Sequence, residues 1–158
     1  MKRAVQVVIA EDQPELRELL REKLQSAPDL EVIGEAHDGW AAVAAVGRLS
    51  PDVMTLDLDL PGLSGLEVLQ IVRWYSPKTM VIILSGHDEE HTMREALKYG
   101  ARGYVVKGEA IDLAKVIRAV QRGEVWAKRR VLARAIEDLV GLANQGVPAT
   151  EVDHPALA

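Results

Sequence analysis

Acidic side chains follow two strongly apolar runs of this sequence, where they could bind a metal ion or react with an electrophile. Glu11 and Asp12 follow AVQVVIA, Asp57 ends DVMTLD, and Asp59 comes two residues later. A Pro-Gly pair then prevents regular structure from continuing. Crowded carboxylates repel one another unless a divalent cation such as Mg²⁺ neutralises them. These acids therefore indicate a candidate magnesium site.

Two other polar residues end apolar runs in the same way. Ser85 ends TMVIILS, and Lys107 ends RGYVVK. A hydroxyl and a compact ammonium both suit the oxygens of an incoming phosphoryl group. Each of these residues, taken alone, is an ordinary loop or capping residue. Acids, hydroxyl and lysine together, each at the end of an apolar run, predict phosphoryl chemistry.

The elements that must position these residues can be read from hydrophobic periodicity. Runs rich in β-branched residues predict five short strands, at residues 4–10, 30–36, 52–57, 79–85 and 102–107. Segments of helical period lie between them, and Asp38, Asp88 and the pair Ser64 and Glu67 are suited to helix N-termini. Strands that alternate with helices predict a parallel sheet between two helical layers. The carboxyl ends of such strands meet at one edge, where the polar residues should converge.

Composition narrows the class of protein. The chain has 158 residues, which fits one domain with an appendage, and it carries a net charge of −5. This charge argues against a dominant DNA-binding surface. The sequence has no cysteine and no apolar run long enough to cross a bilayer, so we expect a cytoplasmic protein with no membrane association.

Several segments, in this order and at this spacing, resemble the receiver domains of bacterial two-component response regulators. They are the acidic pair at residues 11–12, PDVMTLDLDLPGLSGLEVL, ILSGHDEE and GARGYVVKG. The resemblance covers about residues 4–122 and places the receiver domain at residues 1–123. It implies a flavodoxin-like three-layer α/β sandwich, with a five-stranded parallel sheet in the order 2-1-3-4-5.

The resemblance also implies a role for each site residue. Asp57 would accept a phosphoryl group from a histidine kinase, so the domain would be a phosphoacceptor in signalling rather than a conventional enzyme. Mg²⁺ would be held by Glu11, Asp12, Asp57 and the backbone carbonyl of Asp59.

The switch residues follow from the same resemblance. Ser85 and Lys107 would bind phosphoryl oxygens, and Tyr104 would be the aromatic that fills space vacated when Ser85 moves inward. Three positions depart from the usual pattern: Glu11 stands where Asp is commoner, Ser85 where Thr is frequent, and Gly86 where Ala is usual. The lifetime of the phosphoryl group is left open by these departures.

Two other kinds of site use similar residues. Haloacid-dehalogenase-type phosphatases have a strand-end nucleophile with a general acid two residues later, here Asp57 and Asp59, but their motif lies on the first strand and lacks the proline. His87 and His91 have the spacing of a zinc-binding helix. Asp88 stands where that motif needs Glu, and it should cap the helix so that the two imidazoles do not share a face.

The C-terminal region predicts a connection to an output. Residues 124–143 have helical period with an apolar stripe, and residues 144–158 are typical of a flexible linker or tail. The junction resembles that of NarL/FixJ-type regulators, which implies transcription regulation through a DNA-binding domain absent from this chain. A stand-alone receiver acting through protein contacts is the alternative, and the stripe could also support a homodimer.

Overall fold

The computed structural model describes residues 3–146, which form one sheet and six helices. The five strands are all parallel and lie in the order β2-β1-β3-β4-β5. They are β1 (Val5–Ala10), β2 (Leu30–Ala36), β3 (Val53–Leu56), β4 (Met80–Ser85) and β5 (Gly103–Val106). The helices are α1 (Pro14–Gln25), α2 (Gly39–Leu49), α3 (Gly65–Tyr75), α4 (Glu90–Lys98), α5 (Leu113–Gln121) and α6 (Arg129–Gly146). The predicted flavodoxin-like topology is confirmed.

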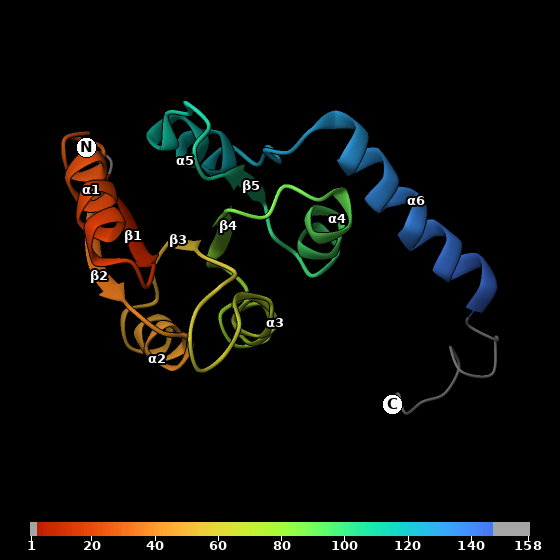
Figure 1. Cartoon of the computed structure of the whole chain (residues 1–158), viewed down its shortest axis with the longest axis horizontal. Coiled ribbons are helices and arrows are strands. Elements are labelled where there is room, and N and C mark those ends of the chain that lie inside the picture. Colours follow the sequence, from red (N-terminus) through yellow and green to blue (C-terminus); the bar gives the residue numbers. More distant parts are fainter. Residues whose placement is uncertain (1–2, 147–158) are drawn as a thin grey trace.

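Helices cover both faces of the sheet, as Figure 1 shows. Helices α1 and α5 pack on one face, and α2, α3 and α4 on the other. Alternate strand residues supply the two cores: Val8 faces α2 and α3, whereas Ile9 faces α1 and α5. Burying each such side chain stabilises the fold by about 1.5–3 kcal/mol. Two apolar layers therefore hold the strands in a fixed register beneath the site.

Short polar signals begin the helices that flank the site. Ser64 and Glu67 form the predicted capping box at α3, and the Asp38 carboxylate accepts the Ala41 N–H at 2.7 Å to begin α2. The prediction for Asp88 was wrong, because α4 begins after Glu89, whose side chain makes no capping hydrogen bond. The backbone N–H of His87 donates to Ser85, and its carbonyl accepts the Tyr104 hydroxyl. These hydrogen bonds hold residue 87 in the extended loop, so the helix begins later in the chain.

The segment after α5 pairs with the edge of the sheet before α6 begins. The backbone N–H of Trp126 donates to the Arg102 carbonyl, and the Trp126 carbonyl accepts the N–H of Tyr104, both at 2.9 Å. This bridge holds residues 124–128 extended, so α6 begins at Arg129 rather than at residue 124. The helix ends at Gly146, within the segment predicted as a tail, and the rest of that tail lies outside the described residues.

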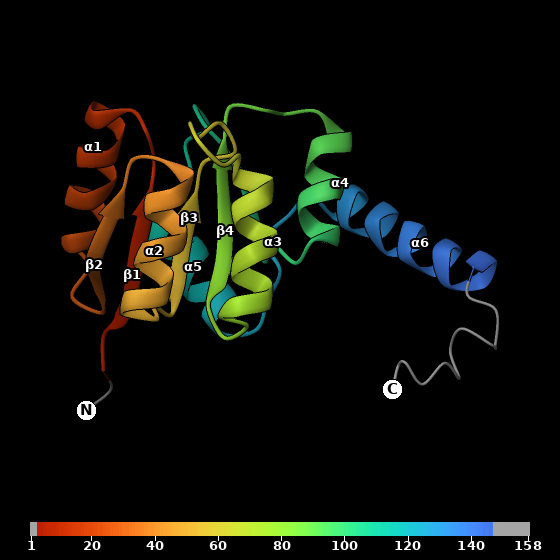
Figure 2. The ribbon, with the colours of Figure 1, turned by 90° about the horizontal axis from the view of Figure 1, so that it is seen from below.

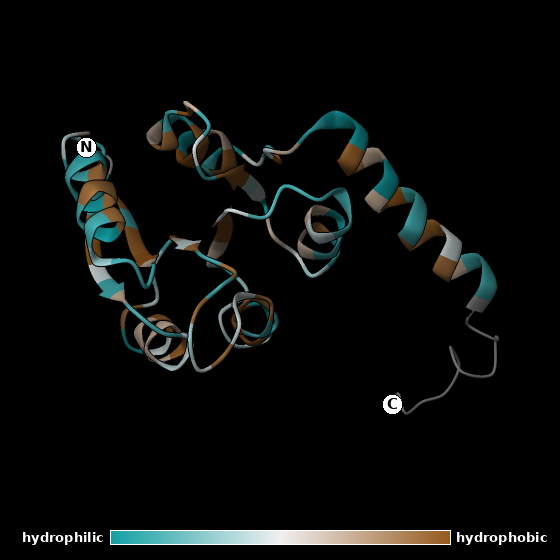
Figure 3. Ribbon diagram, in the orientation of Figure 1, coloured by the Kyte–Doolittle hydropathy of each residue, from teal (hydrophilic) through white to brown (hydrophobic). Residues whose placement is uncertain are grey.

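Helix α6 packs on α4 and then extends away from the rest of the domain (Figure 2). Val131 and Ala135 are buried at this contact. Apolar residues recur along α6, as the hydropathy colours of Figure 3 show. The exposed side chains on this helix include Ile136, Leu139, Val140 and Leu142. No helix among residues 3–146 has the length and apolar character that a membrane span requires.

Ion pairs reinforce the contact between α4 and α6. Asp138 of α6 accepts two hydrogen bonds from the Arg94 guanidinium, at 3.0 and 2.7 Å, and lies 3.4 Å from the Lys98 ammonium. In the other direction, Glu90 of α4 pairs with Arg134 at 2.6 Å. Each helix thus offers both an acid and a base to the other, which fixes their relative orientation.

Candidate functional site

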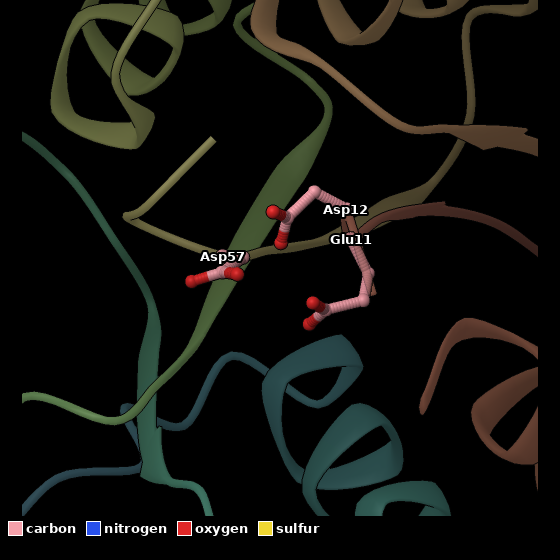
Figure 4. Close-up of side chains that lie close together, drawn as sticks. All are labelled: Glu11, Asp12 and Asp57. Atoms are coloured by element: carbon pink, nitrogen blue, oxygen red, sulfur yellow. The ribbon is translucent and has the colours of Figure 1, made fainter. Parts of the chain in front are cut away.

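Three carboxylates meet at the carboxyl edge of the sheet (Figure 4). Glu11 and Asp12 follow β1, Asp57 follows β3, and one oxygen of each lies within 4.8 Å of the others. The two strands are neighbours, and the Asp57 N–H donates to the Ala10 carbonyl at 3.0 Å, so both chain ends arrive side by side. Glu11 is 1% exposed and Asp57 2% exposed, whereas Asp12 reaches solvent. The predicted convergence of these acids is therefore found.

Lys107 places a positive charge against two of these acids. Its Nζ lies 3.0 Å from Asp57 Oδ2 and 3.1 Å from Glu11 Oε1. Burial alone would lower the pKa of the Lys107 ammonium, but its hydrogen bonds to Asp57 and Glu11 outweigh burial and raise that pKa. The lysine is therefore charged at neutral pH, and it offsets part of the repulsion between the carboxylates.

Glu11 is the member of the cluster whose negative charge is disfavoured by its surroundings. Burial raises the pKa of its carboxyl above the usual value, and this effect outweighs the hydrogen bond from the Gln13 N–H and the charge of Lys107. Within residues 3–146, its Oε1 atom is buried and accepts no well-oriented hydrogen bond, although the Lys107 ammonium is near. An unsatisfied buried carboxylate oxygen costs free energy unless a cation approaches it. This donor set fits a hard, oxygen-seeking divalent cation.

The backbone and the side chain of Asp59 contact different neighbours. Its N–H donates to Asp57 Oδ1 at 3.0 Å, while its carboxylate points to the loop after β4 and lies 2.9 Å from His87 Nε2. The carboxylate is 68% exposed and is engaged with the imidazole rather than with Asp57. A phosphatase would need it as a general acid facing the nucleophile, so this arrangement argues against the phosphatase interpretation.

Ser85 and Tyr104 lie beneath the same loop. Ser85 is fully buried, and its Oγ accepts the His87 N–H at 3.1 Å. The Tyr104 hydroxyl donates to the His87 carbonyl at 2.7 Å, and the side chain is 6% exposed. Burial raises the pKa of Tyr104 to about 12, so the hydroxyl stays a donor at neutral pH. Tyr104 is thus packed inside rather than open to water.

Sequence reasoning considered His87 only as a possible zinc ligand and missed its contacts with the residues of the site. Its backbone contacts Ser85 and Tyr104, and its ring contacts Asp59 at 2.9 Å and Glu89 at 3.5 Å. The hydrogen bond to Asp59 raises the pKa of the His87 imidazole, more than burial lowers it. His87 precedes α4 and His91 lies on its exposed side, and among the described residues neither belongs to a group of three or more metal-ligating side chains. The one sequence feature that could have indicated these contacts was the position of His87, two residues after the serine that ends a strand.

A groove opens beside Lys107, between α1 and the loop that leads to α5. Its volume is about 590 Å³, and its lining includes Leu16, Leu20, Ile111 and Leu113. Lys107, whose ammonium contacts Glu11 and Asp57, also forms part of the groove wall. An apolar surface of this kind, next to charged groups, suits contact with another protein.

Comparison with known proteins gives a consistent result. The family model described as "Response regulator receiver domain" matches residues 7–121. The chain is 33% identical over 155 residues to the uncharacterized transcriptional regulatory protein YxjL of Bacillus subtilis, covering 98% of this chain and 71% of YxjL. It is 32% identical over 145 residues to the nitrate/nitrite response regulator NarL of Escherichia coli K12, covering 91% of this chain and 65% of NarL.

A solved structure agrees with the sequence matches. The signal receiver domain of the response regulator NarL from Mycobacterium tuberculosis superposes with a TM-score of 0.74 at 34% identity. The superposition covers 78% of this chain and all of that domain. The chain spans about two thirds of NarL from E. coli, so part of that relative has no counterpart here.

Proposed function

Since this chain belongs to the response regulator receiver domain family, whose members are phosphorylation-dependent signalling switches, we propose that Asp57 is its phosphoacceptor. The observation that supports this most strongly is the position of its carboxylate. It lies at the centre of the acidic cluster, 2% exposed, with the Lys107 ammonium 3.0 Å from Oδ2. Glu11 is equally buried and also contacts Lys107, but Asp57 follows β3, which lies between β1 and β4, so it stands between the other two acids and Ser85.

The transfer itself needs little from the protein beyond positioning and charge. An oxygen of Asp57 bonds to phosphorus, and the P–N bond of a phosphohistidine breaks with its electron pair leaving on the imidazole. Lys107 stabilises negative charge on the phosphoryl oxygens, and the buried Ser85 hydroxyl is available to one of them. The product is an acyl phosphate on Asp57. The domain therefore catalyses only its own phosphorylation and dephosphorylation.

Mg²⁺ is the cation that fits this donor set best. It would be held by carboxylates of Glu11, Asp12 and Asp57 and by the backbone carbonyl of Asp59. When bound, Mg²⁺ supplies positive charge to the transferring phosphoryl group. The buried Oε1 of Glu11 supports this assignment, because among the described residues it accepts no well-oriented hydrogen bond and a divalent cation would satisfy it.

The metal assignment can be tested without phosphorylation. Millimolar Mg²⁺ should raise the melting temperature of the wild type, because it binds the folded state only. Asp12→Asn should remove most of this increase, whereas Asp59→Asn should keep it, since only the backbone of residue 59 is a ligand. An equal loss in both variants would count against the assignment.

The conformational switch is proposed to run through Ser85 and Tyr104. A phosphoryl oxygen would accept the hydroxyl proton of Ser85 and draw this side chain toward Asp57, which would lengthen the hydrogen bond that Ser85 Oγ accepts from the His87 N–H. Because the His87 carbonyl is also the acceptor for Tyr104, a shift of this loop would be transmitted to the tyrosine. Tyr104 in turn is bonded to Trp126, which leads into α6.

The partners follow from the family and from the exposed surfaces. A histidine kinase would donate the phosphoryl group, with the groove beside α1 as its contact surface. The output would be transcription regulation, with DNA bound through a further domain that α6 would connect to the receiver. Residues 1–123 would then form the receiver module. The exposed apolar side chains of α6 could pair in a homodimer, which light scattering with and without phosphorylation would detect.

The central experiment is labelling with a small phosphodonor. With Mg²⁺ and acetyl phosphate, the intact mass should rise by one phosphoryl group, and Asp57→Asn should abolish the rise. Asp59→Asn is the matched control, because it makes the same change two residues away and should keep the label. Label on a serine or histidine would contradict the proposal. Reading the gene beyond the codon for Ala158 tests the output: a helix-turn-helix region supports transcription regulation, and a stop codon favours a stand-alone receiver.

A further inference from the structure

Arg17 lies in the first part of α1 and reaches back to the acidic pair that follows β1. Its Nη1 donates to the backbone carbonyl of Glu11 at 2.8 Å. Side chains of an α-helix lean toward its N-terminus, and Glu11 lies just before α1, so the direction of the helix favours this contact. The Arg17 side chain is 21% exposed. Arg17 is therefore next to the site, but it is not one of the groups assigned to Mg²⁺ or to the phosphoryl group.

The carbonyl that Arg17 binds belongs to the peptide that joins Glu11 to Asp12. The carboxylates of these two residues lie on either side of that peptide and, with Asp57, come within 4.8 Å of one another (Figure 4). The Glu11 N–H is also held, because it donates to the Ala36 carbonyl at 2.9 Å. A peptide unit is planar, so fixing its carbonyl also fixes the direction in which the chain continues to Asp12.

Glu35, near the carboxyl end of β2, holds Arg17 from the other side. Its Oε1 lies 3.4 Å from Arg17 Nε, and its Oε2 lies 3.2 Å from Nε of Arg21, on the next turn of α1. A planar guanidinium has its donors in a fixed fork, so Nη1 can bind Glu11 while Nε faces Glu35. Among residues 3–146, the ion pairs of Arg21 reach only Glu35 and Glu18. Arg17 thus connects β2 to the acidic pair, and Arg21 does not.

We propose that Arg17 is a positioning residue that holds Glu11 and Asp12 in the arrangement that binds Mg²⁺, with Glu35 as its anchor. This inference deepens the proposed function and rests on the proposed metal site. Clustered carboxylates repel one another, so a loop that was free to turn would move Asp12 away from Asp57. Arg17 opposes this movement by holding the backbone, and the ligands are then already arranged when Mg²⁺ arrives.

Charge and positioning predict opposite effects for the loss of Arg17. A cation close to the site repels Mg²⁺, so removing its charge alone should make Mg²⁺ bind more tightly. Removing the support of the acidic pair should make Mg²⁺ bind more weakly. Groups that orient metal ligands typically contribute at least about 10-fold to metal affinity, which exceeds the effect of a partly exposed charge. Arg17→Met, which keeps an apolar stem of similar shape, should therefore raise the Kd for Mg²⁺ about 10-fold.

Titration of the full chain with Mg²⁺ alone, followed by calorimetry, measures this Kd without phosphorylation. The rate of labelling by acetyl phosphate gives a second readout: Arg17→Met should need more Mg²⁺ for half of the maximal rate, while the rate at saturating Mg²⁺ stays near that of wild type. Arg17→Lys should have an intermediate Kd, because one ammonium can bind the Glu11 carbonyl but cannot also face Glu35 as the fork does.

Arg21→Met is the matched control, because it removes the same charge from the same partner, Glu35, one turn further along α1. Its Kd should stay within about twofold of the wild-type value. A variant Arg17→Met that melts at a lower temperature without metal but keeps the wild-type Kd would show a structural role only and would overturn the inference. An equal rise in Kd in both Met variants would overturn it too.

Two further outcomes are also decisive. If Arg17→Met does not fold, Arg17→Lys takes its place, and a wild-type Kd in that variant contradicts the inference. If the wild type itself does not bind Mg²⁺, the proposed metal site has failed and the inference fails with it. Mg²⁺ binding by the wild type without any label on Asp57 would instead contradict the phosphoacceptor assignment and leave the comparison of Kd values valid.

Discussion

The backbone N–H of Tyr104 donates to the carbonyl of Trp126 at 2.9 Å, which ties a residue of the site directly to the segment that begins α6. The two side chains also line one small cavity of about 190 Å³, together with Met93 and Val131. A movement of Tyr104 would therefore shift Trp126 first, and the shift would then pass to α6.

Trp126 should report on phosphorylation. In a protein with Trp40→Phe and Trp74→Phe, the remaining indole lines the cavity that contains Tyr104. Addition of Mg²⁺ and acetyl phosphate should change its emission, because repositioning Tyr104 alters the surroundings of the ring. Adding Asp57→Asn to the same protein should abolish the change. Emission that stays constant while mass spectrometry shows full labelling would mean that the switch does not pass through Tyr104.

Glu11→Gln should make the metal-free protein more stable. Burial raises the pKa of Glu11 above its ordinary value of 4.5, so the folded state binds this proton more tightly than the unfolded chain does. The contribution of Glu11 to stability is therefore present at low pH, and it is lost as the pH rises from 4.5 through the raised pKa of the folded state. The variant should lack this pH dependence and gain roughly 1 kcal/mol in the free energy of unfolding at neutral pH.

Urea unfolding in a chelating buffer, at several pH values, measures this difference. Millimolar Mg²⁺ should reduce or reverse the difference in the free energy of unfolding between variant and wild type, because the wild type keeps a carboxylate ligand that the variant has lost. A variant that is less stable than wild type at neutral pH without metal would show that Lys107 already satisfies Glu11 fully.

Gly65→Ala should disturb the phosphoacceptor loop. A Cβ at residue 65 would meet the carbonyl oxygen of Asp57 and the Cα of Leu58, and both are backbone atoms that cannot rotate away. The expected cost is about 1–3 kcal/mol of stability, with slower labelling by acetyl phosphate because Asp57 is displaced. Gly86→Ala is the matched control for stability, since a Cβ there meets no atom within 4 Å. Equal melting temperatures for the two variants would contradict this packing.

Asp138→Asn should loosen α6 from α4. This carboxylate accepts two hydrogen bonds from Arg94 and also faces Lys98, and the amide loses the charge on which both contacts depend. Hydrogen exchange of peptides from residues 129–146 should become faster, while exchange in β1 and β3 stays unchanged. Glu137→Gln makes the same chemical change at the adjacent exposed position, and there exchange should match the wild type. Faster exchange in both variants would point to helix propensity instead.

The parallel sheet and the position of the acidic cluster were predictable because they depend on local rules, whereas the strand order was predicted from the resemblance to receiver domains. Runs such as VVIA and VIIL identify buried parallel strands, and each polar residue of the cluster directly follows such a run. Parallel strands place these ends at one edge, and the pairing of β1 with β3 brings Glu11 and Asp57 together there. The boundaries of α4 and α6 were less predictable, because contacts from distant residues, to His87 and to Trp126, decided where each helix begins.

The sequence alone determined which chemical groups reach the edge of the sheet, because strand periodicity and chain direction leave them no other place. The tertiary structure decided how those groups are used. It turned the Asp59 carboxylate toward His87 and bonded Tyr104 to both the loop after β4 and the segment before α6. Within residues 3–146, it also left Glu11 Oε1 without a well-oriented hydrogen bond. These outcomes depend on the packing of loops that are far apart in the chain, and no local pattern encodes a distance between them.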